Sequence, residues 1–294
     1  MSKVAFVFPG QGSQVVGMGR DIFQTSSIAR QVFEEADETL GFSLSKLCFE
    51  GPENKLRQTK NTQPAIMTVS IACLRAAFGD KNGIQPVFVA GHSLGEYTAL
   101  VVAGVLSFSN GLRLVRERAR LMQEAGEKRP GGMAAIIGLD LVSLQEVCRE
   151  TGTEVANINS PKQTVISGTN KGLVWAMNLA KARGARKVIR LNVSGGFHSL
   201  LMQSAVEGLT RAISQFDFSD PMVPLVANIT ARPAFTVEEI KNGILQQVCG
   251  CILWQSSIEY MINAGVSTFI EIGPRQVLTK LIKKISSDVD VRNI

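Results

Sequence analysis

The chain has 294 residues, of which 45% are hydrophobic and 19% charged, a balance that suits a globular protein with a sizeable core and excludes a largely disordered one. Its formal net charge is +6, but there is no long basic run and only 6% of the residues are aromatic, which disfavours a nucleic-acid partner. The N-terminal apolar run stops at Pro9, too early for a signal peptide, and no stretch approaches the roughly 18 apolar residues of a membrane helix. We therefore expect a cytoplasmic protein with no membrane partner.

The first part of the chain is predicted to alternate buried strands with helices. Two apolar runs, 4–8 and 86–90, are predicted strands, because each is followed at once by a glycine-containing turn. Neither run alternates apolar with polar residues, which is typical of parallel strands covered by helices on both faces. Helices are expected at 27–40, 61–78, 94–104 and 109–125.

The pattern changes after residue 130. The next elements follow the order strand, helix, strand, strand, helix, strand, which is the ferredoxin-like βαββαβ pattern. They are expected at 133–138, 142–150, 154–159, 163–168, 171–183 and 187–193. We therefore predict a small ferredoxin-like domain, 128–195, inserted into a large α/β domain with a mainly parallel sheet, formed by 1–127 and 196–294. Two further strands are expected near 223–227 and 267–271.

The cysteines predict neither disulfides nor a metal site. There are five of them, an odd number without the spacing of a disulfide framework, so we expect reduced thiols. Cys249 and Cys251 are separated by one glycine, but no second pair of cysteines or histidines completes a tetrahedral site. No metal and no bound cofactor are therefore expected.

The strongest local motif is Gly91-His-Ser-Leu-Gly95, a G-x-S-x-G sequence between a predicted strand and a predicted helix. This is the setting of a nucleophile elbow, in which a sharp turn exposes the serine Oγ and the glycines avoid clashes. The helix N-terminus behind it supplies free N–H groups for a developing oxyanion. Ser93 is therefore a candidate nucleophile. The alternative is a serine that caps the helix in a tight turn.

A nucleophilic serine needs a base, and the chain has only two histidines. His92 is adjacent to Ser93 at a tight turn, where neighbouring side chains diverge, so it is a poor candidate. His198 lies where the predicted small domain returns to the large one, a placement that suits a cleft between domains. By elimination His198 is the candidate base. A histidine after a Gly-Gly loop is otherwise often structural.

A lone arginine is predicted on the buried face of the helix at 109–125. Arg118 shares the apolar stripe of Leu114 and Met122, four residues away on either side. An unpaired buried cation is costly, so Arg118 needs an anion. One candidate is an internal Asp or Glu. The other is a substrate carboxylate, which the planar guanidinium binds with two parallel hydrogen bonds.

Taken in order, several motifs resemble those of the malonyl-CoA:acyl-carrier-protein transacylase family, and the resemblance covers essentially the whole chain. The motifs are Phe8-Pro-Gly-Gln-Gly-Ser-Gln14, Gln63-Pro-Ala65, Gly91-His-Ser-Leu-Gly-Glu-Tyr97, Arg118 before Met122-Gln123, Asn159-Ser-Pro161 leading to Val165-Ile-Ser-Gly168, Phe197-His-Ser199 and Glu271-Ile-Gly-Pro274. Several spaced motifs in the right order are far more specific than a single elbow.

The resemblance implies a reaction and a fold. A malonyl group would pass from malonyl-CoA to the phosphopantetheine thiol of a holo acyl carrier protein, in fatty-acid or polyketide synthesis. The mechanism would be ping-pong, through a malonyl-serine ester, with malonyl-CoA as a substrate. The large domain would be α/β-hydrolase-like and would carry the ferredoxin-like insert, and a monomer is expected.

The resemblance also implies residue roles. Ser93 would be the acylated nucleophile and His198 its general base. The backbone N–H groups of Gln11 and Leu94 would form the oxyanion hole. Arg118 would bind the malonyl carboxylate.

Three further positions bear on the acyl group and the histidine. Phe197 resembles the malonyl-type rather than the methylmalonyl-type signature. The family usually has Asn-Pro-Val, then Gln or Arg, then Trp, where this chain has Gly250-Cys-Ile-Leu-Trp254. In the family the residue before that Trp orients the histidine through its backbone carbonyl, so this role would fall to Leu253. Gly196 replaces the usual small residue or proline before Phe197, a change expected to loosen the loop that carries the histidine.

Two other functions fit parts of the sequence. A serine hydrolase or thioesterase would use the same elbow, but hydrolases of that fold usually orient the histidine with an acidic residue, and no convincing one is found. A noncatalytic scaffold would have no need of Ser93, His198 and Arg118. The carrier proteins of this family are acidic, so basic residues near the end of the small domain are a candidate docking site, with a solvated surface as the alternative. These residues are Lys181, Arg183, Arg186, Lys187 and Arg190.

Overall fold

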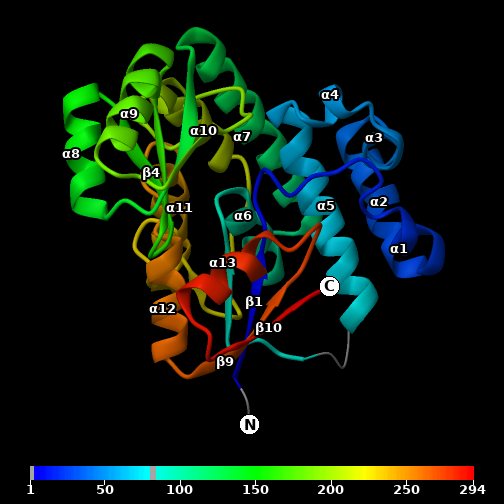
Figure 1. Cartoon of the computed structure of the whole chain (residues 1–294). Helices are drawn as coiled ribbons and strands as arrows, with labels where there is room; N and C mark the ends of the chain where they lie inside the picture. Colours follow the sequence, from blue (N-terminus) through cyan, green and yellow to red (C-terminus); the bar gives the residue numbers. More distant parts are fainter. Residues whose placement is uncertain (1–2, 80–83) are drawn as a thin grey trace.

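The computed structural model describes residues 3–79 and 84–294, and these residues form two separate sheets (Figure 1). The larger sheet has the strand order β10-β9-β1-β2-β7-β8, and its neighbouring strands are parallel except for β7 and β8. The smaller sheet, in the order β4-β5-β3-β6, is antiparallel. This confirms the predicted mixed α/β class with a mainly parallel sheet.

Strand β1 lies inside the larger sheet and is buried on both faces. Phe6 and Phe8 belong to one apolar core, and Ala5 and Val7 belong to a second one, because successive side chains of a strand face opposite sides. Burial on both faces explains why this run shows no alternation in the sequence. The strands of the sheet are β1 (Lys3–Phe8), β2 (Phe88–Gly91), β7 (Leu225–Val226), β8 (Pro233–Ala234), β9 (Val266–Glu271) and β10 (Asp290–Asn293).

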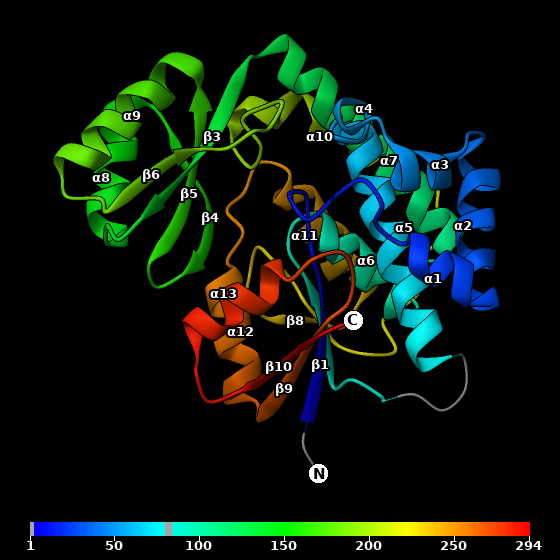
Figure 2. The ribbon, with the colours of Figure 1, turned by 45° about the vertical axis from the view of Figure 1, so that its right-hand side comes forward.

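Helices contribute to both of these cores (Figures 1 and 2). Helices α12 (Trp254–Asn263) and α13 (Val277–Ile285) supply the core that contains Ala5. The core that contains Phe8 is built with α1 (Arg20–Thr25), α2 (Ser27–Leu40), α3 (Leu44–Glu50), α4 (Glu53–Leu56), α5 (Thr59–Phe78), α6 (Leu94–Val102), α7 (Phe108–Lys128), α10 (Gln203–Ile213) and α11 (Val237–Gln247). A 3-10 turn, η1 (Leu200–Met202), precedes α10.

The smaller sheet stands beside this body with two helices of its own (Figure 2). Ala134 and Ile136 of this sheet pack with α8 and α9 in a third core. The neighbouring Met133 and Ala135 belong to the main core instead, so the two faces of the small sheet have different partners. The elements are β3 (Gly131–Ile137), α8 (Leu141–Thr151), β4 (Glu154–Ser160), β5 (Gln163–Thr169), α9 (Asn170–Ala182) and β6 (Lys187–Arg190).

The two parts are joined by backbone hydrogen bonds as well as by packing. The N–H of Ile158 in β4 donates to the carbonyl of Ile252 over 2.9 Å, and the N–H of Ile252 donates to the carbonyl of Ala156 over 2.8 Å. This short parallel bridge ties β4 to the segment that precedes α12. It places the end of β4 close to the turn that follows β2.

Most predicted elements are present, and the differences are local. Helix α2 has the predicted bounds, whereas β6 ends at Arg190, before the predicted end at 193. The N–H of Leu191 still donates to the carbonyl of Met133, but the chain then leaves the sheet, and residues 191–193 line a cavity. Helices α1, α3 and α4 and strands β8 and β10 were not predicted, since each is too short to show a periodic pattern. No ranges were predicted for helices α10 to α13 either. Within the described residues, no helix is both long and apolar enough to cross a membrane.

Candidate active site

Ser93 lies at the turn between β2 and α6 in a strained backbone conformation. Its φ of 54° and ψ of −105° fall in a region that residues with a side chain rarely adopt. A Cβ added to Gly91 would lie 1.9 Å from the carbonyl carbon of Gly95, and one added to Gly95 would lie 2.0 Å from the carbonyl oxygen of Phe8. Both glycines of the motif are therefore required by close packing. The Ser93 side chain makes no capping hydrogen bond to α6, so the capping alternative does not describe it.

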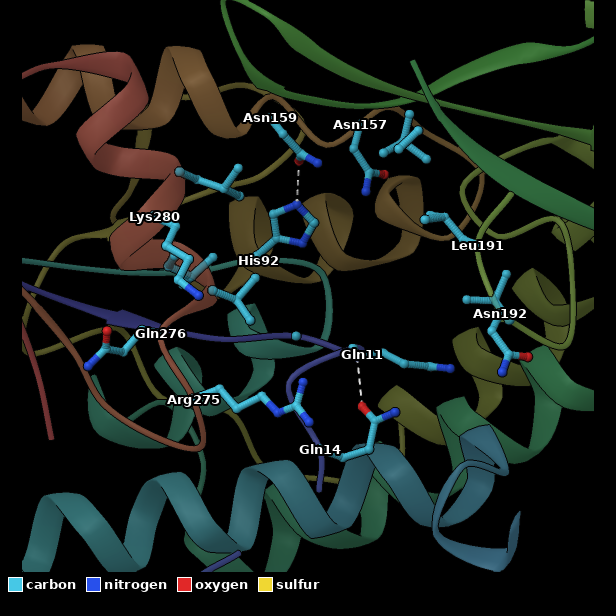
Figure 3. A pocket seen from close by; sticks show the side chains of 18 of the residues that line it. Gln11, Gln14, His92, Asn157, Asn159, Leu191, Asn192, Arg275, Gln276 and Lys280 are labelled. Atoms are coloured by element: carbon cyan, nitrogen blue, oxygen red, sulfur yellow. Dashed lines mark hydrogen bonds between the residues drawn. The ribbon is translucent and has the colours of Figure 1, made fainter. Parts of the chain in front are cut away.

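The imidazole of His198 faces Ser93. Its Nε2 lies 2.8 Å from the Ser93 Oγ, and its Nδ1 lies 2.8 Å from the backbone carbonyl oxygen of Gln247. A carbonyl oxygen only accepts, so Nδ1 carries the proton and Nε2 presents its lone pair to the hydroxyl. This is the tautomer that a general base needs. The other histidine, His92, contacts the Oδ1 of Asn159 through Nε2 over 2.8 Å (Figure 3).

Both histidines are expected to be neutral in the resting protein. Burial, and then the positive charge of Arg118, lower the pKa of His198 to about 3, and burial also lowers the pKa of His92. In long-range 1H–15N NMR spectra we expect the His198 imidazole not to titrate between about pH 8 and about pH 5, whereas the His92 midpoint should lie below its ordinary value, and His92→Asn would assign the two sets of signals. A His198 signal with a midpoint near the ordinary value of about 6.5 would contradict this expectation.

The carbonyl that orients His198 belongs to Gln247, so the prediction for Leu253 is wrong. Gln247 is the last residue of α11, and a carbonyl in the last turn of a helix has no acceptor role within that helix, so it is available to the imidazole. Leu253 instead precedes α12, where its N–H donates to the carbonyl of Asn228 over 2.9 Å. It lines a different cavity, together with Thr230 and Tyr260.

The loop that carries His198 is closely packed rather than loose. A Cβ added to Gly196 would lie 2.7 Å from the Leu201 Cδ1 and 3.1 Å from the Ser167 Oγ. The neighbouring side chains therefore leave little room for a Cβ at this position, and the effect of the glycine on loop mobility stays a prediction. Phe197 is 5% exposed and lines the same cavity as His198.

Arg118 lies on α7 and is 1% exposed. Its Nη1 donates to the Gln63 Oε1, and its Nη2 donates to the Gln247 Oε1 over 2.8 Å and lies 3.3 Å from the Ser93 Oγ. The guanidinium lies 4.9 Å from the centre of the Tyr97 ring. Among the described residues no carboxylate lies within ion-pair distance of it. The structural ion pair therefore has no partner in that part of the chain, and a buried positive charge faces the nucleophile.

Two backbone N–H groups beside Ser93 are free to bind an oxyanion. Gln11 and Leu94 line the same cavity as Ser93, and neither N–H donates to another described residue. The N–H of Ser93 is not available, because it donates to the Oδ1 of Asn228 over 2.8 Å. The side chain of Gln11 is held by Thr59, whose hydroxyl donates to the Gln11 Oε1 over 2.8 Å.

The residues that hold these groups in place were mostly missed by the sequence. Asn228 accepts from the N–H of Ser93 and donates to the carbonyl of Gly91 over 2.6 Å, so one buried amide spans the elbow. Neither Asn228 nor Gln247 lies in any motif that the sequence singled out. Gln63 and Glu96 do lie in such motifs, but no local pattern indicated their contacts.

The site opens into two connected cavities. The inner cavity of about 80 Å³ is lined by Ser93, His198, Arg118 and Phe197 among others. It adjoins a cleft of about 580 Å³ (Figure 3), bounded by α13 and the loop after β1 on one side and by the small sheet on the other. Residues that line both are Gln11, His92, Asn157, Leu191 and Val193. The charged residues of the cleft are mostly basic: Arg57, Arg275, Lys280 and Lys284, against Glu53.

The described residues offer no cluster for a metal ion. No group of three or more His, Cys, Asp or Glu side chains in 3–79 and 84–294 is arranged to hold one. The five cysteines are unpaired.

The arrangement is that of an acyl-transfer site, and comparisons with known proteins agree. Residues 5–293 match the family model described as acyl transferase domain. A malonyl CoA-acyl carrier protein transacylase of Bacillus subtilis (strain 168) is 46% identical over 97% of this chain and 91% of its own length. An acyl-carrier-protein-S-malonyltransferase structure from Bartonella henselae has a TM-score of 0.96 and 41% identity, covering 99% of this chain and 95% of the other.

A further solved structure contains a carrier protein. It is a type II PKS acyl-carrier protein in complex with its malonyl-transacylase, with a TM-score of 0.97, 38% identity, and coverage of 100% of this chain and 96% of that one. With the serine–histidine pair, the free N–H groups and the buried arginine in their places, this chain belongs to the malonyl-CoA:acyl-carrier-protein transacylase family.

Proposed function

We propose that the protein transfers a malonyl group from malonyl-CoA to the phosphopantetheine thiol of a holo acyl carrier protein, through an ester on Ser93. The observation that carries the proposal is a buried Arg118, without a carboxylate partner among the described residues, 3.3 Å from a serine Oγ that also faces His198. A serine and a base supply acyl transfer, and the arginine supplies the preference for an acyl group with a carboxylate.

In the first half-reaction the Nε2 of His198 takes the hydroxyl proton as the Ser93 Oγ attacks the thioester carbonyl. The N–H groups of Gln11 and Leu94 bind the oxyanion of the tetrahedral intermediate. The C–S bond then breaks, and the leaving CoA thiolate takes the proton from His198. The acyl group remains on Ser93 as an ester.

The second half-reaction repeats these steps with the carrier thiol as the nucleophile. His198 takes the thiol proton, the sulfur attacks the ester carbonyl, and the same two N–H groups bind the new oxyanion. When the C–O bond breaks, His198 returns the proton to the Ser93 Oγ. The mechanism is therefore ping-pong, and the enzyme regains its starting state.

Arg118 binds the malonyl carboxylate during both half-reactions. The inner cavity of about 80 Å³ holds a small acyl group, and the cation lies at its wall. The adjoining cleft of about 580 Å³ then takes the pantetheine arm of either thiol, with Arg57, Arg275 and Lys284 near its phosphates. This assignment moves the expected carrier contact toward α13.

The cluster predicted from the sequence at 181–190 is less well supported as a docking site. Arg183 is paired with Glu146 and Glu150 on α8, so its charge is already partly neutralised. None of the five residues of that cluster lines the cleft, although the residues that follow it, 191–193, do. We therefore propose only that this cluster lies next to the cleft that takes the carrier's pantetheine arm.

Some finer points of the fold and setting remain part of the same proposal. The order β3-α8-β4-β5-α9-β6, and a core whose buried residues all lie between 134 and 180, support a ferredoxin-like small domain at 128–195. The strand–elbow–helix at Ser93 supports an α/β-hydrolase-like large domain at 1–127 and 196–294. We also propose that the protein is a cytoplasmic monomer. It uses no cofactor, since both half-reactions need only the groups named above.

Intact-mass analysis tests the proposed function. Malonyl-CoA should make the wild-type protein heavier by one malonyl group, about 86 Da, on a peptide that contains Ser93. Adding a phosphopantetheinylated carrier should remove that mass and place it on the carrier. Ser93→Ala is the control and should take up no label. A wild type that releases malonate to water as fast as it is acylated, with no gain on the carrier, would show a hydrolase or thioesterase instead.

A further inference from the structure

Behind the nucleophile lies a buried carboxylate that the two half-reactions do not use. Glu96, in the first turn of α6, is 1% exposed. One of its oxygens accepts a hydrogen bond from the backbone N–H of Asn228 over 3.2 Å, and the other accepts from the side-chain amide of Gln247. Both neighbours are donors, so the ionised form of Glu96, which only accepts, is the one that fits this place.

The Gln247 side chain links Glu96 to the substrate-binding arginine. Its Nε2 donates to Glu96 and to the backbone carbonyl of Ser93 over 3.0 Å. Its Oε1 accepts from the Nη2 of Arg118 over 2.8 Å. An amide can rotate by half a turn and exchange these two ends, so its orientation is set by neighbours that only accept, which are the Glu96 carboxylate and the Ser93 carbonyl. The Asn228 Oδ1, 3.3 Å from the Nε2, is a further acceptor on that side.

We propose that Glu96 is a positioning residue that acts through the amide of Gln247, fixing its oxygen toward Arg118 and so holding the guanidinium in place for the carboxylate of the acyl group. This inference rests on the proposed function. It assigns to Glu96 a role in the choice of acyl group, separate from the chemistry at Ser93.

The polarity of the contacts explains why a carboxylate is needed. In Glu96→Gln one oxygen becomes an NH2 group, which must face either the Asn228 N–H or the Gln247 NH2. The backbone N–H cannot turn, but the Gln247 amide can. Turning brings its NH2 group against the Nη2 of Arg118 and its oxygen toward the Ser93 carbonyl, which then loses its hydrogen bond. Two donors then face each other, so Arg118 loses a hydrogen bond and is displaced.

The cost of keeping this carboxylate supports a specific role. Burial raises the pKa of Glu96 to about 7, even though the Asn228 N–H, the Gln247 amide and the charge of Arg118 act in the opposite direction. A buried charge lowers the stability of the protein, so a neutral residue would be more favourable here unless the charge of Glu96 has a use.

The test compares malonyl-CoA with acetyl-CoA, which has no carboxylate for Arg118 to bind. For Glu96→Gln we expect the malonyl-to-acetyl ratio of kcat/KM to fall by about 10- to 100-fold, the value of one charge-assisted hydrogen bond. Glu271→Gln is the matched control. Glu271 is also fully buried, and its carboxylate accepts from the N–H groups of Leu278 and Thr279 over 2.9 and 2.7 Å, outside the inner cavity. That variant can lose stability, but its ratio should stay within about twofold of the wild type.

A double-mutant cycle tests the route through Gln247. Gln247→Met removes the amide, keeps the backbone carbonyl for His198, and should lower the ratio as Glu96→Gln does. The double variant should be no worse than Gln247→Met, because Glu96 then has nothing left to orient. An unchanged ratio in either single variant, or additive losses in the double variant, would overturn the proposal. If Glu96→Gln does not fold, Gln247→Met still tests directly whether the amide positions Arg118. A wild type that takes no malonyl on Ser93 would instead overturn the proposed function.

Discussion

Arg118→Ala is expected to lower the kcat/KM for malonyl transfer by about 10²–10⁴-fold while sparing or raising transfer from acetyl-CoA. Each charge-assisted hydrogen bond to the carboxylate contributes about 1.5–3 kcal/mol, and the planar guanidinium makes two. Acetyl-CoA has no carboxylate to lose. In the wild type it leaves a buried cation, 1% exposed, with no anion in direct contact among the described residues. The kinetic constants for both donors, measured on the same folded preparation, give the answer.

Arg118→Lys should recover only part of the malonyl activity. An ammonium carries the charge but cannot make the two parallel bonds of a guanidinium, and it would not keep contacts with both Gln63 and Gln247. A merely structural Arg118 makes a different forecast, because loss of these contacts and of the Tyr97 ring would lower the melting temperature and depress both donors alike. Parallel losses on malonyl-CoA and acetyl-CoA would therefore reject the role as a carboxylate anchor.

His198→Ala is expected to slow acylation of Ser93 by about 10²–10⁴-fold or more, the range typical of a lost general base. The Nε2 of His198 is 2.8 Å from the Oγ, and no other ring nitrogen in the described residues contacts that hydroxyl. Rapid-quench measurement of the malonyl-enzyme in a single turnover isolates this step. The loss should appear with acetyl-CoA as well, because the base acts on the serine and not on the acyl group.

His92→Ala is the matched control for this experiment. His92 contacts Asn159 over 2.8 Å and lies with its ring 5.6 Å from the ring of Trp254, so its removal should cost stability. A measurable acylation rate should nevertheless remain, since its imidazole does not contact Ser93. Equal losses from the two histidine variants would mean that the base was assigned to the wrong residue.

The backbone carbonyl of Gln247 explains why His198 needs no acidic partner to orient it. In a hydrolase triad a carboxylate holds the imidazole tautomer. Here a backbone carbonyl, that of Gln247, accepts from Nδ1 over 2.8 Å. A carbonyl selects the same tautomer but stabilises an imidazolium less than a carboxylate does, and the nearby charge of Arg118 opposes protonation further. Thioesters are reactive acyl donors with good leaving groups, so the first half-reaction needs less from its base than amide hydrolysis does.

The sequence by itself was sufficient for the features that depend on neighbouring residues. The G-x-S-x-G spacing predicted the turn at Ser93, because the close packing of Gly91 and Gly95 is imposed by the strand and helix on either side of them. Helix α2 was predicted to the residue, since its apolar period lies within the segment and its capping residues, Ser26 and Gly41, lie directly beside it. His198 could be named because only two histidines compete for the role.

Only the tertiary structure decided which groups hold these residues in place. Gln247 lies 154 residues from Ser93 and 49 from His198, and Asn228 lies 135 residues from Ser93, distances over which no periodic pattern operates. The Leu253 prediction failed for this reason: a backbone carbonyl is present at every residue, so no side chain marks the one that the fold turns toward the imidazole. The hydrogen-bond partners of Arg118 could not be predicted either, because an apolar stripe on one helix indicates that a charge is buried but not which side chains contact it. Neighbouring residues determine local geometry, whereas the polarity of a buried network depends on which distant donors and acceptors the packed elements bring together.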